Sequence, residues 1–286
     1  MRNTYPLVVV VVVIFFSLGF QPKTLAQGNS DHFALYIITP TTAYVQPINS
    51  MTGTEETPIT LPIPAGSSAT TTAKLSPTGN WLVYLTLLPN PGNTASHSLQ
   101  LYNLSTTEIR IISLPNIDDV VEENGILWSP NSQYIAINII RGRDSHPHIY
   151  SLSDDILHSI SDSDKDAHQL SWNNDSDMVI GGVSASIQDY LETYVVSTYS
   201  TSMSFPLQTF PYRLFVSCNH VWSPDDTLIA FGAGCILGGR SGGNPLTVKE
   251  LHILDINQSN VERITDYTVT AYQQGTEYFD VTFTPY

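Results

Sequence analysis

A short hairpin motif recurs along the chain at intervals of 44 to 61 residues, and this repeat constrains the fold more than any other feature. In each copy an apolar strand leads into a turn of the Ser-Pro type, and a second apolar strand follows two or three residues later. Pro fixes φ at one position of a tight turn, and small polar residues tolerate the backbone conformation of the next position. Each copy therefore predicts two antiparallel strands joined by such a turn. The copies begin at Ala73, Ile126, Leu170 and His220, and a fifth, VTFTPY, begins at Val281.

Two more strands are predicted downstream of each hairpin. The third strands are LQLYNLS from Leu99, HIYSLSD from His148, YVVSTYS from Tyr194 and ELHILDI from Glu250. A fourth strand follows, as in EIRIISLP from Glu108. Units of four short strands, repeated radially, are typical of β-propeller blades. The sequence therefore predicts an all-β protein, a single β-propeller of about five four-stranded blades.

The spacing of the turns predicts how this ring closes. The turn residues are Ser76, Ser129, Asn173, Ser223 and Thr284, and a closed ring would leave a last interval of 52 residues, inside the range of the others. The N-terminal segment supplies strands from His32, Ala43 and Thr57. We therefore expect the C-terminal strand to begin the blade that these strands complete, which leaves no open edge. A sixth blade would need another hairpin, and the long intervals contain none.

The N-terminus has the layout of a secretory signal peptide. Arg2 precedes an apolar run from Leu7 to Phe16, and a short polar stretch ends at Ala26. The run is shorter than the roughly 20 apolar residues that span a membrane. We predict cleavage near Ala26, a propeller domain over residues 27–286, and a secreted or periplasmic protein that is not inserted in the membrane. An uncleaved N-terminal anchor is the alternative.

The net charge narrows the class of partner. Removing residues 1–26 takes away Arg2 and Lys23 but no acid, which leaves 9 basic and 26 acidic residues and a formal charge of −17. Nucleic-acid binding relies on an excess of Lys and Arg, so nucleic acid is not expected as a partner. Charged residues make up 13% of the chain, against about 25% in an average domain, and such a surface is typical of β-rich exported proteins.

The hairpin motifs carry a family resemblance. The sequences WSPDD and WSPNS, followed by LIAFG and YIAIN, resemble the propeller repeats of bacterial TolB and of related WD-repeat-like proteins. The resemblance covers nearly all of residues 27–286 and implies a propeller fold, but it implies no function. The chain departs from TolB in lacking an N-terminal α/β domain and one blade, so the partners of TolB are not carried over. One repeat position holds Trp128, Trp172 and Trp222, with Leu75 and Phe283 in the other copies, and is expected in the core.

The two cysteines of the chain, Cys218 and Cys235, lie on the two strands of one predicted hairpin. Export to an oxidising compartment makes a disulfide between them the expected state. A free pair is the alternative, because the sequence does not show that the two Cα atoms lie within about 7 Å.

Charged residues gather in the loops at the end of the blades opposite the hairpin turns, where propellers usually bind. Asp144 lies there with the basic residues Arg141, Arg143, Lys165, Arg213 and Arg240. Arg forks in such loops would hold a carboxylate or an acidic sugar. The alternative is that loops are simply where charged residues lie.

Two segments partly match metal-binding patterns. Asp162, Asp164 and Asp166 alternate as in a calcium loop, but the glycine and the closing Glu of such a loop are missing, so a solvated acidic turn is the simpler interpretation. His146 and His148 would suit zinc only with a third His or Cys. No cofactor is predicted, and calcium remains the open alternative.

Taken together, these patterns favour a monomeric, non-catalytic exported binding module that recognises a protein or a cell-envelope glycan. The alternative is a five-bladed glycoside hydrolase with two or three carboxylates in its central funnel. Asp280 and Glu277 are the acids best placed for that role, but the other inner strands carry uncharged residues at the position of Asp280, namely Thr72, Gly125, Gln169 and Asn219. The GRSGG segment lies in a Gly-rich loop of a predicted blade, so Ser241 is not predicted as a nucleophile.

Overall fold

The computed structural model describes residues 10–14, 32–38, 42–49, 52–55, 57–88, 96–116, 119–142, 144–160, 166–184, 189–206, 216–235 and 250–266. These residues form strands and turns and contain no helix, so none of them belongs to a helix long and apolar enough to span a membrane. The chain divides into two compact units, residues 1–124 with 153–157, and residues 125–152 with 158–286.

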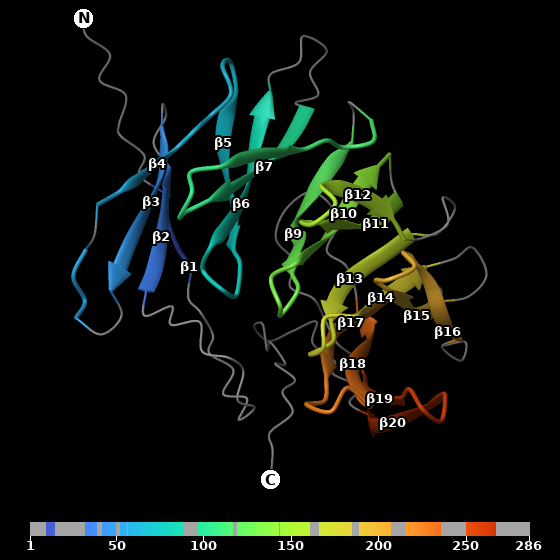
Figure 1. Cartoon of the computed structure of the whole chain (residues 1–286). Helices are drawn as coiled ribbons and strands as arrows, with labels where there is room; N and C mark the ends of the chain where they lie inside the picture. Colours follow the sequence, from blue (N-terminus) through green and yellow to red (C-terminus); the bar gives the residue numbers. More distant parts are fainter. Residues whose placement is uncertain are drawn as a thin grey trace, which may run out of the picture. The chain divides into compact units, whose positions relative to one another are not determined.

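Two four-stranded sheets belong to the first unit (Figure 1). The first sheet consists of β1 (Val10–Ile14), β2 (His32–Ile38), β3 (Ala43–Asn49) and β4 (Ile59–Leu61). The second consists of β5 (Ser68–Leu75), β6 (Trp81–Leu88), β7 (Ser96–Asn103) and β8 (Ile109–Ile112). Within each sheet every strand pairs antiparallel with the next strand of the chain.

Three further four-stranded sheets follow along the chain. The third, most of which lies in the second unit, contains β9 (Val120–Trp128), β10 (Tyr134–Arg141), β11 (Asp144–Ser151) and β12 (Ile156–Ser159). The fourth contains β13 (Asp166–Trp172), β14 (Met178–Ser184), β15 (Asp189–Val195) and β16 (Ser200–Pro206). The fifth contains β17 (Val216–Trp222), β18 (Leu228–Cys235), β19 (Glu250–Asp255) and β20 (Asn260–Asp266). The predicted all-β class and its four-stranded units are confirmed.

The Ser-Pro-type hairpin turns share one set of hydrogen bonds. At Ser129 the backbone N–H donates to the Tyr134 carbonyl (2.9 Å), and the hydroxyl accepts from the Tyr134 N–H (3.0 Å). Asn173 stands at the Ser position of its hairpin, and its side-chain oxygen accepts from the Met178 N–H in the same way (2.9 Å). The residue three positions after the turn residue has a positive φ in all four turns, at Gly79 (75°), Ser132 (60°), Ser176 (64°) and Asp226 (56°). The same local pattern thus forms the same turn in four of the sheets.

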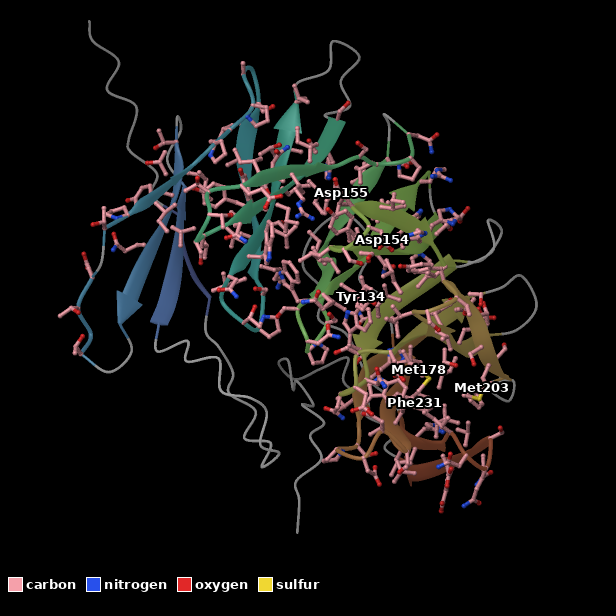
Figure 2. All side chains as sticks on the ribbon, in the orientation of Figure 1. Tyr134, Asp154, Asp155, Met178, Met203 and Phe231 are labelled. Carbon is pink, nitrogen blue, oxygen red and sulfur yellow. The ribbon has the colours of Figure 1, made fainter. Side chains whose placement is uncertain are left out.

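Apolar residues between neighbouring sheets form the core. In the first unit one cluster joins Val45 and Leu61 to Leu82 and Tyr84, and the Tyr84 hydroxyl donates to the Pro62 carbonyl (2.6 Å). In the second unit two clusters pack the third sheet on the fourth and the fourth on the fifth; their members include Trp172 and Trp222. In Figure 2, Tyr134 is labelled at the cluster between the third and fourth sheets. Phe231, Met178 and Met203 are labelled at the cluster between the fourth and fifth sheets. The repeated Trp position is therefore a packing position, as predicted for these two residues.

The first sheet differs from the sequence prediction in its first strand. We expected the strand from Val281 to pair with the strand from His32, whereas β1 pairs there, with Val10 opposite Ile38 and Ile14 opposite Ala34. The run of Val and Ile in the N-terminal apolar segment has a high β propensity, which suits a strand paired with β2. Residues 281–286 lie outside the described part of the chain, so their closure of a ring stays a prediction.

Candidate functional site

Each of the second to fifth sheets has two distinct ends. We call the end with the Ser-Pro-type hairpin turn the turn end, and the opposite end, where the second strand leads to the third, the loop end. In the second unit the turn ends are tied to one another. The Ser176 hydroxyl accepts from the Asn131 N–H (3.0 Å), and the Asp226 carboxylate accepts from the N–H groups of Asn174 (2.9 Å) and Asp175 (3.0 Å). The polar groups of the turn ends thus join neighbouring sheets.

Asp225 is engaged within its own turn. Its Oδ1 accepts from the hydroxyls of Ser223 (2.6 Å) and Thr227 (2.9 Å). These hydrogen bonds favour the ionised carboxylate and hold the pKa of Asp225 below its usual value. The acidic SPDD sequence is therefore explained by turn formation.

Buried polar side chains repeat in the middle of the third strands. One register position, opposite Tyr84, Ile137, Gly181 and Phe231 of the second strands, holds in turn Gln100, His148, Glu192 and His252. All four side chains are buried. In β7 and β11 this position separates an apolar half of the strand near the turn end from a more polar half near the loop end. Burial of unpaired polar groups is costly, so such a repeated exception to an apolar core requires partners.

Glu192 is the buried carboxylate of this set, at 1% exposure. It accepts long hydrogen bonds (3.3 Å each) from the Tyr194 hydroxyl to Oε2 and from the Ser204 hydroxyl to Oε1. Gly181, the residue opposite in β14, has no side chain, which leaves room for the carboxyl group. Glu192 is therefore a buried carboxyl group whose oxygens face the hydroxyls of a Tyr and a Ser.

Two imidazoles flank one phenyl ring in the fifth sheet. The Phe231 ring lies 5.4 Å from that of His252, nearly parallel to it, and 6.3 Å from that of His220. His220 is buried, and its Nδ1–H donates to the Gln169 carbonyl of β13 (2.6 Å). Desolvation by burial lowers the pKa of His220 to about 4, against the raising effect of the Gln169 hydrogen bond. This imidazole is therefore neutral at pH 7 and joins the fourth and fifth sheets.

The loop end of the third sheet presents the predicted charged pair. Arg141 ends β10 and Asp144 begins β11, and the two stand directly opposite each other in the register, both exposed. Directly below them on β11, Ser145, His146 and His148 are buried, and the His148 Nδ1–H donates to the His146 carbonyl (2.9 Å). An exposed guanidinium over buried polar groups can hold an anionic group by hydrogen bonds and charge.

Most of the other predicted site residues fall outside the described part of the chain. Arg143, Arg213 and Arg240 lie outside it, as do Asp162 and Asp164. Asp166 begins β13, but its side chain is not among those described. No group of three or more His, Cys, Asp or Glu in the described residues is arranged to hold a metal ion, and calcium at Asp162, Asp164 and Asp166 stays a prediction.

The backbone register constrains the predicted disulfide. Cys235 stands opposite Val216, and Cys218 opposite Gly232, with irregular register on both sides of Cys218. The cysteines therefore lie on adjacent strands of one hairpin, as predicted, and are diagonal neighbours because bulges shift the pairing. Their side chains are outside the described part, and the disulfide remains a prediction.

Sequence reasoning missed the buried set in the third strands. A signal was present, because Gln100, His148 and Glu192 each precede a Tyr by two residues, at Tyr102, Tyr150 and Tyr194. This pattern was overlooked because a polar side chain in a strand that alternates polar and apolar residues is normally expected to face the solvent.

No family model matches the sequence, and no curated protein matches it. Solved structures do match. An oligogalacturonate lyase in complex with manganese is 10% identical with a TM-score of 0.57, over 84% of this chain and 65% of the lyase. A second oligogalacturonate lyase, from Vibrio parahaemolyticus, is 9% identical with a TM-score of 0.55, over 83% of this chain and 64% of that one. The lyases are β-propeller proteins.

The chain has a β-propeller fold. It spans slightly less than two thirds of the length of the lyases. A TolB from Agrobacterium tumefaciens is also matched, at 13% identity and a TM-score of 0.46 over 82% of this chain and 76% of that one, and the fold assignment rests on the lyases. The resemblance to propeller repeats that the WSPDD and WSPNS motifs carry is thereby confirmed at the level of the fold.

Proposed function

We propose that this propeller is a non-catalytic, exported binding module, and that its loop ends bind a carboxylate-bearing partner, a protein or a cell-envelope glycan. One observation carries the proposal: Arg141 and Asp144 are exposed opposite each other at the loop end of β10 and β11, above a buried polar layer. The turn ends, in contrast, use their polar groups between sheets. In our proposal the loop end is the end that offers its charged groups to a partner.

The overall charge makes local arginines decisive. A chain at −17 after removal of residues 1–26 repels anions at long range, so an anion must be held by direct contacts with Arg. In our proposal Arg143, Arg213 and Arg240 supply these contacts together with Arg141. The same proposal includes removal of residues 1–26, a secreted or periplasmic location, a monomeric ring of about five blades closed by the C-terminal strand, and a disulfide between Cys218 and Cys235.

The proposal is tested with defined anionic probes. An oligogalacturonate stands for an acidic glycan, a Glu-rich peptide for an acidic protein segment, and a neutral maltooligosaccharide is the negative control. Calorimetry should detect binding of an acidic probe only, and Arg141→Ala should weaken it about tenfold, which corresponds to about 1.4 kcal/mol.

Arg110→Ala is the matched control for charge. Arg110 lies in β8, where it pairs with Glu108 (2.7 Å) and covers the Trp81 ring, so this variant removes one positive charge outside the loop ends. It should leave the Kd unchanged. If neither acidic probe binds, or if both variants weaken binding equally, the loop-end proposal is wrong.

A glycoside hydrolase is the second candidate, and Glu192 with Tyr194 is the observation that favours it. The names of the lyases also give an acidic polysaccharide fragment as the molecule those proteins act on. A hydrolase would release reducing ends from polygalacturonate, and Glu192→Gln would abolish the release. If the wild-type protein releases none, this candidate is excluded for that substrate.

A further inference from the structure

The first sheet contains a strand that the proposed processing removes. β1 (Val10–Ile14) pairs antiparallel with β2 through five residues and is the edge strand at the β2 side of the order β1-β2-β3-β4. In the second, fourth and fifth sheets the corresponding strand is β5, β13 or β17, the strand that leads into a Ser-Pro-type turn. β1 lies wholly within residues 1–26 and leads into no such turn.

Loss of β1 would leave the first sheet with three strands. The N–H and C=O groups of β2 that pair with β1 would lose their partners, and an unpaired strand edge is a template for another strand. The four other sheets would keep four strands each. The edge of β2 therefore needs an occupant once residues 1–26 have gone.

The sequence contains a segment with the right pattern for this edge. Residues 281–285, VTFTP, repeat the end of β17 and its turn, HVWSP, with Phe283 at the position of Trp222 and Thr284 at that of Ser223. The second strands β6, β10, β14 and β18 each pair with a first strand that leads into a Ser-Pro-type turn, so among the described sheets β2 is the second strand that such a segment could join.

We propose that β1 holds the place of the strand ending at Phe283, and that removal of residues 1–26 lets this C-terminal strand replace β1 on the edge of β2. The inference rests on the processing and ring closure in our proposed function, but on no ligand. It makes folding of the ring dependent on export, because the precursor keeps the site filled. The partner of the edge is a segment of the same chain.

The register of the replacement strand follows from the repeat. In the fifth sheet Val221 stands opposite Ala230 and Trp222 opposite Ile229. In the second sheet Leu75 stands opposite Leu82, two residues before Tyr84, which itself lies opposite Gln100. Gln46 is the buried polar residue of β3 and stands opposite Leu35. If Gln46 corresponds to Gln100, Phe283 lies opposite Phe33, and Thr282 opposite Ala34.

Cysteine cross-linking tests the exchange, because only adjacent strands bring Cα atoms within about 7 Å. The Ala34→Cys, Thr282→Cys variant of the full chain is prepared in two forms, exported and processed, or unprocessed from the cytoplasm. After mild oxidation, mass spectrometry of peptides separates the new bond from any bond of Cys218 and Cys235. The 34–282 bond should form in the processed protein, with a roughly tenfold lower yield in the unprocessed chain.

Two further variants complete the design. Ile14→Cys with Ala34→Cys should cross-link in the unprocessed chain, because β1 places these residues opposite each other. Ile38→Cys with Thr282→Cys is the matched control and should not cross-link in either form, because Ile38 lies four residues farther along β2. A processed chain without the 34–282 bond, or equal yields in both forms, overturns the exchange. An exported chain that retains residues 1–26 contradicts the proposed processing as well.

Discussion

The turn ends of the sheets are nearly alike, whereas the middle of their third strands differs from sheet to sheet. Four turns share the same backbone hydrogen bonds and the same left-handed position, even where Asn173 replaces Ser. At the register position in the middle of the third strands, by contrast, the side chain is an amide, a carboxylate or an imidazole. The comparison teaches that repetition in this sequence marks architecture, and that a buried position on which no turn depends can vary in its chemistry from sheet to sheet.

The strongest test of the turn ends is at Asn173. Its side-chain oxygen accepts from the N–H groups of Asp177 and Met178, and its amide donates to Asp177 and Asp226. Asn173→Ala removes the hydrogen bonds that this buried side chain makes to the turn and to Asp226, and should lower the free energy of unfolding by about 3 kcal/mol. Urea denaturation measures it.

Asn173→Ser is the matched control, because Ser occupies this position in the other three turns. A hydroxyl restores the hydrogen bond to the N–H five residues on, as in Ser129 and Ser223. It should retain more than half of the stability that Asn173→Ala loses. Equal losses in the two variants would show that the shared turn geometry is not what stabilises the hairpin.

The next effect is a loss of stability in acid. The pKa of His220 is lowered to about 4 in the folded protein from an ordinary value of 6.5, so the unfolded chain binds the proton more readily between these values. The contribution of His220 is fully present above pH 6.5 and is lost as the pH falls toward 4. It should amount to about 2 kcal/mol between pH 7 and pH 4.5.

His220→Asn separates this contribution from that of other titrating groups. The amide keeps a donor toward the Gln169 carbonyl but does not titrate. The drop in unfolding free energy between pH 7 and pH 4.5 should be smaller in the variant than in the wild-type protein. An identical pH dependence of both proteins would mean that His220 is not buried in its neutral form.

A smaller effect distinguishes two tryptophans of the same repeat position. The Trp172 indole N–H donates to the Leu127 carbonyl (3.1 Å), whereas that of Trp222 is buried without a hydrogen-bond partner among the described residues. Both replacements by Phe remove the same volume. Trp172→Phe should therefore be more destabilising than Trp222→Phe by about 1 kcal/mol in urea denaturation. The reverse order would place the partner of Trp222 outside the described residues.

The smallest effect is expected at the exposed pair of Arg110 and Glu108. This ion pair is partly solvated, and such pairs stabilise by under about 1 kcal/mol. Glu108→Ala should shift the midpoint of thermal unfolding little, and raised salt should abolish the shift. A large, salt-independent loss would instead point to packing of Arg110 on Trp81.

The sequence predicted the hairpins, the four-stranded units and the packing role of Trp172 and Trp222 because each depends on local pattern. It did not predict that Asp226 receives the N–H groups of the neighbouring turn, since that contact joins residues about fifty positions apart. The diagonal placement of Cys218 and Cys235 was missed because bulges interrupt the alternation of a strand. The pairing of β1 was missed because an apolar N-terminal run was assigned only to export.

The central claim is that the turn ends stabilise the fold and the loop ends bind. The most direct measurement records both Kd for the acidic probe and unfolding free energy for Asp226→Asn and Arg141→Ala. Asn adopts the left-handed backbone conformation of Asp226 readily, but its amide oxygen is a weaker acceptor than the carboxylate for the Asn174 N–H. Asp226→Asn should therefore lower the free energy of unfolding by about 1 to 2 kcal/mol and leave the Kd unchanged. Arg141→Ala should weaken binding with unchanged stability. If Arg141→Ala lowers stability and leaves the Kd unchanged, the division between the two ends is contradicted.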